Sequence, residues 1–276
     1  MISDITLGQF FPGESHLHKA DPRTKIVGSI VYMAAIFCAK NVFAYLFMIL
    51  FTAMLAMVGH IRIRLLWKSI KPLFFVLLIM SMINLFATKG TGEPLLSFWK
   101  ITIYEEGIWR AVLVSVVRVV LLVMGSSLLL TYTTSPIQLT DGIETLLSPL
   151  KKIHVPVHEF AMMMTIALRF IPTLIEETDK IMKAQKARGA DFSSGGLIKR
   201  AKALLPVLIP LFVSSFQHAM DLATAMECRC YHGGEGRTKY RILKFTGVDV
   251  WIGLALLVAL AAVIVINKFL PIGNVM

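Results

Sequence analysis

The sequence predicts an all-α, polytopic membrane protein with about five transmembrane helices and long amphipathic helices on the cytoplasmic face. Hydrophobic residues make up 56% of its 276 residues, a higher share than a soluble domain of this length usually carries. They gather in long runs that alternate with basic segments, and the formal net charge is +11. A basic excess beside apolar runs is typical of cytoplasmic loops that face anionic lipid, so the lipid bilayer rather than nucleic acid is the expected partner.

Five apolar runs are the predicted membrane spans. They cover residues 26–39, 42–59, 72–87, 107–131 and 250–270. The first two are shorter than the roughly 20 residues that a full crossing needs. With a tight turn at Lys40-Asn41 they predict a short helical hairpin, and one long bent helix is the alternative.

The charge of the loops predicts how the spans are oriented. Lysine and arginine residues precede the first run and fill the loop at 60–71, whereas the loop at 88–106 has no basic excess. Positively charged loops stay on the cytoplasmic side of a membrane. The N-terminus, the 60–71 loop and residues 133–245 are therefore expected inside the cell, and the C-terminus outside.

Three parts of the chain follow from this pattern. Residues 1–132 are expected to hold the N-terminal transmembrane helices, residues 133–245 a cytoplasmic helical module, and residues 246–276 the C-terminal transmembrane helix. The module lacks an uninterrupted apolar run of about 20 residues, the length that reads as a transmembrane helix. We therefore expect it to lie along the membrane surface or to stack on itself.

Amphipathic helices are predicted throughout residues 133–245. One begins at Ser135-Pro136 and runs to about Lys152, a second covers 157–187, and a third covers 197–231. Apolar residues recur in them at three- and four-residue steps, which is the period of one helix face. Prolines inside the two long helices predict bends there.

The two long helices end on similar short sequences. Ala187-Arg188-Gly189 ends the first, and Cys228-Arg229-Cys230 ends the second. An arginine in the last turn complements the helix dipole whatever its function. Its planar guanidinium can also bind a carboxylate or a carbonyl cluster of another protein bidentately. Because the arrangement occurs at matched ends of two matched helices, it predicts a repeated docking site for a dimeric or pseudo-dimeric partner.

Several segments of the chain resemble one known family. They are Lys19-Ala20-Asp21-Pro22-Arg23-Thr24-Lys25, Thr134-Ser135-Pro136, Leu168-Arg169-Phe170-Ile171-Pro172 and Ala184-Gln185-Lys186-Ala187-Arg188-Gly189. On these segments, the chain resembles the transmembrane T component of energy-coupling factor transporters, the EcfT/CbiQ family, and the resemblance covers nearly its whole length. The family usually carries Ala-Arg-Gly at both helix ends, and this chain departs from it with Cys228-Arg229-Cys230 at the second.

The resemblance implies a non-catalytic coupling subunit of an importer, without a cofactor of its own. Two ABC-type ATPase subunits, EcfA and EcfA', would each receive one helix end, with Ala187, Arg188 and Gly189 at one and Cys228, Arg229 and Cys230 at the other. A separate S component would bind a vitamin or another micronutrient. That protein would sit on the apolar faces of the long helices, on Met163, Met164, Phe170, Leu208 and Phe212.

One rival hypothesis comes from another functional class. Arg118, Asn84 and Ser126-Ser127 fall in predicted spans and could form the polar site of a membrane enzyme or channel. For Arg118, the competing interpretations are an ion pair within the protein and a place in the turn of a tilted helix.

A metal site is the weaker alternative. Cys228, Cys230, His232 and His218 are metal-ligand types, but positions i and i+2 of a helix point apart. No metal is therefore expected.

Overall fold

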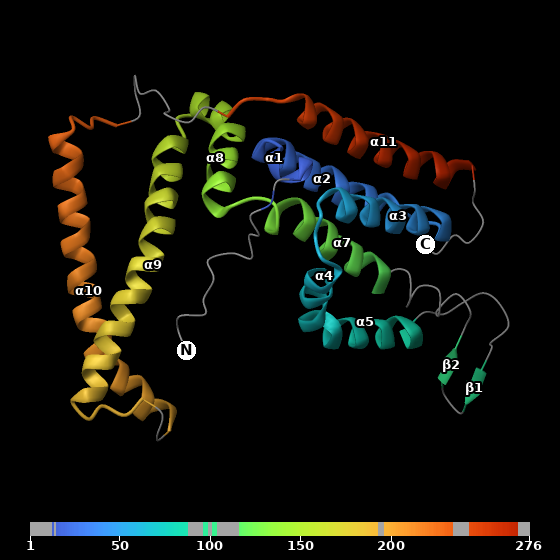
Figure 1. Cartoon of the computed structure of the whole chain (residues 1–276). Helices are drawn as coiled ribbons and strands as arrows, with labels where there is room; N and C mark the ends of the chain where they lie inside the picture. The colour runs from blue at the N-terminus through green and yellow to red at the C-terminus, as the bar shows by residue number, and fades with distance from the viewer. Residues whose placement is uncertain are drawn as a thin grey trace. The chain divides into compact units, whose positions relative to one another are not determined.

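The computed structural model of the chain describes residues 13, 15–87, 96–98, 101–103, 116–192, 196–233 and 243–269 (Figure 1). The chain divides into two units. The bundle unit comprises residues 8–143 and 243–276, and the hairpin unit comprises residues 144–242 with residues 1–7.

The bundle unit is built almost entirely of helices. In chain order they are α1 (His16–Lys19), α2 (Pro22–Cys38), α3 (Val42–Val58), α4 (Ile63–Ile70), the 3₁₀-helix η1 (Lys71–Leu73), α5 (Phe74–Ala87), α7 (Arg118–Ser126), the π-helix η3 (Ser127–Thr131), most of α8 (Pro136–Leu146) and α11 (Gly247–Phe269). The all-α class is confirmed. Within the predicted 88–106 loop, β1 (Leu96–Phe98) and β2 (Ile101–Ile103) form a small antiparallel hairpin.

Helices α2 and α3 form the helical hairpin that the sequence predicts. Asp21 caps the start of α2 by accepting a hydrogen bond from the backbone N–H of Arg23 at 2.9 Å. Beyond the turn, the hydroxyls of Tyr32 and Thr52 lie 2.6 Å apart. In one continuous helix, residues 20 positions apart would be separated by about 30 Å. The single bent helix is therefore excluded.

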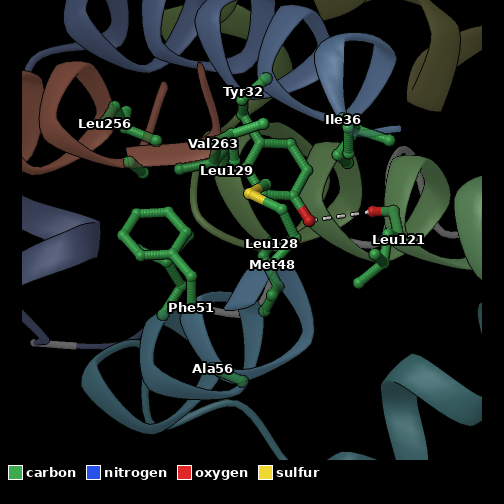
Figure 2. Close-up of a cluster of buried hydrophobic side chains, with 14 of the residues drawn as sticks. Tyr32, Ile36, Met48, Phe51, Ala56, Leu121, Leu128, Leu129, Leu256 and Val263 are labelled. Carbon is green, nitrogen blue, oxygen red and sulfur yellow. Dashed lines mark hydrogen bonds between the residues drawn. The ribbon is translucent and has the colours of Figure 1, made fainter. Parts of the chain in front are cut away.

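A buried apolar cluster joins α2, α3, α7, η3 and α11 (Figure 2). Its members include Tyr32, Ile36, Met48, Phe51, Leu121, Leu128, Leu129, Leu256 and Val263. Gly125 on α7 allows the closest approach, because a Cβ added there would lie 1.9 Å from Cε1 of Tyr32. Small residues of this kind let helix backbones pack closely where lipid surrounds them.

Buried polar groups join the ends of the bundle helices. Lys25 is only 1% exposed, and its Nζ donates to the carbonyl oxygens of Thr133 at 2.8 Å and His18 at 3.2 Å. The backbone N–H of Asp21 donates to Oδ1 of Asp249 at 2.6 Å. The 19–25 segment therefore joins α2 to the turn after η3 and to the start of α11.

The hairpin unit contains the end of α8, the 3₁₀-helix η4 (Ser148–Ile153), α9 (Val157–Ala187) and α10 (Leu197–Cys228). The bounds of α9 are those predicted, and α10 ends three residues before the predicted Tyr231. The predicted single helix to Lys152 is wrong: α8 stops at Leu146 and η4 follows. Ser148-Pro149 explains the break, because a proline disfavours helical backbone in the residue before it.

Helices α9 and α10 run side by side in opposite directions (Figure 1). The side-chain amide of Gln185 donates to the carbonyl oxygen of Pro206 at 3.4 Å. Further along, the hydroxyl of Ser214 donates to the carboxylate of Glu177. Residues nearer the start of α9 thus contact residues nearer the end of α10, as expected for antiparallel helices.

Four helices are long and apolar enough to cross a membrane, within the part of the chain that the structure describes. They are Arg64–Leu85, Val157–Ala187, Ile198–Cys228 and Gly247–Phe269. A fifth span is possible if Arg118–Thr131 and Pro136–Leu146, which bend by 93°, count as one. A multi-pass membrane protein is therefore supported, although two of the four helices, α9 and α10, belong to the segment that the sequence predicts to lie along the membrane surface or to stack on itself. Residues 107–115 of the predicted fourth span lie outside the described residues.

Candidate functional site

The end of α9 has the hydrogen bonds of a Schellman motif. The N–H of Gly189 donates to the carbonyl of Lys186 at 3.0 Å, and the N–H of Ala190 donates to that of Gln185 at 3.0 Å. Gly189 has a φ of 90°, in the left-handed region that closes such a motif. Arg188 is the last residue before this reversal, so its side chain leaves the helix at its very tip.

The end of α10 repeats this geometry residue by residue. The N–H of Cys230 donates to the carbonyl of Glu227 at 2.9 Å, and the N–H of Tyr231 donates to that of Met226 at 3.1 Å. Cys230 has a φ of 55° and so takes the place of the glycine. Arg229 therefore holds the position at α10 that Arg188 holds at α9, although the neighbouring residues differ.

Both arginine tips are open to solvent. Ala187, Arg188 and Gly189 are exposed, and so are Cys228, Arg229 and Cys230. Neither guanidinium forms an ion pair with another described residue. The free carbonyls and the negative end of the dipole favour a cation at each tip. Each guanidinium also keeps its donors available for an acidic or carbonyl-rich partner.

The two tips lie at opposite ends of the helix pair. The contact between Gln185 and Pro206 places the beginning of the antiparallel pairing of α9 and α10 near Arg188. Arg229 follows Pro206 by 23 residues, a rise of about 35 Å along a helix. The sequence predicts similar arginine-bearing ends for α9 and α10. Because the two helices are antiparallel, these ends lie at opposite ends of the helix pair.

The predicted apolar contact residues are mostly exposed. Met163 and Met164 on α9 are each 53% exposed, and on α10 Leu208 is 54% and Phe212 is 65% exposed. Phe170 differs, because its ring lies 6.1 Å from the ring of His218 within the helix pair.

A polar contact inside the helix pair has no counterpart in the sequence predictions. Glu177 accepts from Ser214 and lies 3.6 Å from Nε2 of His218. The sequence indicates this contact only through polar residues at helix-face spacing on two separate helices.

Arg118 has a structural place in the bundle. Its Nη2 donates to the carbonyl oxygen of Ala39 at 3.2 Å. Its guanidinium carbon lies 5.8 Å from the ring centroid of Tyr45 and 5.9 Å from that of Phe37. These contacts tie α7 to the turn between α2 and α3, so the intramembrane polar site is not favoured.

The other residues of the rival and metal hypotheses have separate local partners. Asn84 donates to the carbonyl of Met80, and Ser126 to that of Val123, each within its own helix. His218 faces Glu177, whereas Nδ1 of His232 lies 2.8 Å from the carbonyl oxygen of Cys230. Among the described residues, no group of three or more metal-ligating side chains comes together.

Comparison with known protein sequences shows the family to which this chain belongs. A family model described as CbiQ, cobalt transport protein, matches residues 13–240. The energy-coupling factor transporter transmembrane protein EcfT of Acidaminococcus fermentans is 53% identical over 274 residues, which cover 99% of each chain. The protein of that name from Clostridium kluyveri is 51% identical, with 94% of this chain and 95% of the relative covered. The one from Bacillus subtilis is 45% identical, with 95% and 97% covered. The chain belongs to the EcfT/CbiQ family of energy-coupling factor transporter transmembrane proteins.

Proposed function

We propose that this chain is the coupling subunit of an energy-coupling factor importer of the ABC type. Two ATPase subunits would hydrolyse ATP and drive the movement, and the chain itself would perform no catalysis. A separate S component would carry a vitamin or another micronutrient. The N-terminus and helices α9 and α10 would face the cytoplasm, as the basic loops suggest.

The two matched helix tips are the observation that carries this proposal. Arg188 and Arg229 occupy the same position in the same hydrogen-bonded helix ending. The rise of about 35 Å between them along α10 is too great for one groove to hold both. Two ATPase subunits, each receiving one arginine, account for both the repetition and the separation.

The exposed apolar side chains support an S component contact on α9 and α10. Met163, Met164, Leu208 and Phe212 are each more than half exposed. Methionine adapts its shape readily, which suits a surface that accepts different partners. Phe170 would contribute the part of its ring that His218 leaves open.

Charge reversal tests the docking of the ATPases. Each of Arg188→Glu and Arg229→Glu is expected to remove one ATPase copy from the purified complex, and the double variant both copies. The reason is that an acidic side chain repels the groove that an arginine would fill. Subunit stoichiometry after co-purification and ATP-driven uptake are the measurements.

A matched control separates local docking from total charge. Arg169 and Lys180 are exposed cations of α9 that lie eight or more residues before Arg188, so Arg169→Glu with Lys180→Glu should leave the stoichiometry intact. If the double tip variant binds both ATPases and transports normally, the proposal is wrong. Loss of both ATPases from either single tip variant would argue against two separate docking points.

A further inference from the structure

Helix α4 and Lys71, the first residue of η1, carry a stripe of basic and aromatic side chains that the proposed function does not use. Arg64, Trp67, Lys68 and Lys71 follow one another at helical spacing, i, i+3, i+4 and i+7, and therefore share one face. All four are exposed, and Trp67 is 71% exposed. These four residues are called the α4 stripe below.

The opposite face of α4 is held against the bundle. Leu66 is 2% exposed and belongs to the buried cluster. The hydroxyl of Tyr132 donates to the carbonyl oxygen of Leu65 at 3.0 Å and contacts the hydroxyl of Ser69. The helix therefore cannot turn its stripe inward, and the four side chains are fixed in an outward direction.

Among the residues that the structure describes, the cations of the stripe form no ion pair with an acidic side chain. The sequence contains no aspartate or glutamate from His60 to Ala87. Three cations within two helical turns repel one another, so the arrangement favours a bound anion.

The stripe stands at the start of an apolar segment, the position at which basic and aromatic residues typically meet lipid headgroups. It occupies the first turns of the apolar segment Arg64–Leu85, which is long enough to span a bilayer. After Lys71 the segment contains no charged residue up to Ala87. Tryptophan prefers this interfacial depth, and lysine and arginine there attract anionic lipid.

We propose that the α4 stripe binds the headgroup of an anionic phospholipid. The phosphate would lie among Arg64, Lys68 and Lys71, and the indole of Trp67 would rest at the upper part of the acyl chains. This site shares no residue with the arginine tips of α9 and α10, and it assigns the start of the Arg64–Leu85 segment a ligand of its own.

Fluorescence quenching by brominated lipids tests this site directly. The full-length chain with Trp99→Phe, Trp109→Phe and Trp251→Phe retains Trp67 as its only tryptophan. It is placed in phosphatidylcholine nanodiscs with equal mole fractions of brominated phosphatidylglycerol or brominated phosphatidylcholine. Brominated phosphatidylglycerol is expected to quench Trp67 more strongly, and this preference should weaken as salt is raised.

Removing the charges should abolish this lipid preference. Arg64→Gln, Lys68→Gln and Lys71→Gln together leave Trp67 in place, and the preference is expected to fall by roughly fivefold for each cation removed. The matched control carries Lys151→Gln, Lys152→Gln and Lys199→Gln, three exposed cations of the hairpin unit, and should keep the preference.

Several outcomes would overturn the proposal. Equal quenching by both lipids would mean an interfacial anchor without headgroup selectivity, and quenching by neither would mean that protein covers Trp67. If soluble glycerol phosphate protects Trp67 from quenching by brominated phosphatidylglycerol, the stripe is a site for free phosphate instead of a lipid site. The comparison of the two lipids on the intact stripe remains decisive even if the triple variant unfolds.

Discussion

Gly189 and Cys230 occupy the same backbone position at the ends of α9 and α10, with φ values of 90° and 55°. Glycine takes this left-handed conformation at little cost, whereas a residue with a Cβ loses about 1–2 kcal/mol there. The second tip therefore keeps the helix ending of the first while carrying backbone strain that the first avoids.

Substitutions at Gly189 and Cys230 should change the free energy of unfolding in opposite directions. Gly189→Ala is expected to lower the free energy of unfolding by about 1 kcal/mol, and Cys230→Gly to raise it by a similar amount. Thermal unfolding of the purified chain in detergent measures both. Gly253→Ala is the control, because Gly253 does not have a positive φ and, like Gly189, has no atom within 4 Å of an added Cβ. Equal effects of the two alanine substitutions would contradict the strain argument.

A methyl group at Gly125 should separate α7 from α2. Its Cβ would overlap the ring of Tyr32 at 1.9 Å, and overpacking of this kind costs about 1–3 kcal/mol. Gly125→Ala should therefore lower the unfolding midpoint. Gly253→Ala on α11, where nothing lies within 4 Å, should not. Tyr32→Leu should offset part of the loss in the double variant, and additive effects would exclude a direct clash.

Loss of the Lys25 ammonium should weaken the junction at the start of α2. Lys25→Met removes the donor to the carbonyl oxygens of Thr133 and His18. A buried acceptor left without its partner costs about 1–3 kcal/mol, so the free energy of unfolding should fall by that amount. Lys19→Met is the exposed control from the same segment. Equal stability of the two variants would show that the buried contact contributes nothing.

Replacement of Arg118 should affect stability more than transport. Arg118→Met leaves the carbonyl oxygen of Ala39 without this donor, and the expected loss is about 2 kcal/mol. Uptake per assembled complex should remain near that of the unsubstituted chain, since no substrate path is assigned to Arg118. Complete loss of uptake in a normally assembled complex would revive the rival hypothesis of an intramembrane site.

Local sequence signals determined much of the secondary structure. Gly189 indicates the end of α9, because capping depends only on neighbouring residues. Asp21-Pro22 is a local signal of the same kind at the start of α2, although the apolar run predicted only residues 26–39. The three- and four-residue apolar steps gave α9 its bounds, and short motifs sufficed to indicate the family. The similar ending at Arg229 was also visible, although the left-handed conformation of Cys230 was not.

Only the tertiary structure decided which distant residues meet. Lys25 reaches Thr133 across 108 positions, and Asp21 reaches Asp249 across 228. Periodicity reports which face of a helix is apolar, but it carries no information about which helix covers that face or in which direction it runs. For this reason the sequence alone determined two arginine-tipped helices, whereas the antiparallel packing of α9 and α10 decided that their tips lie far apart.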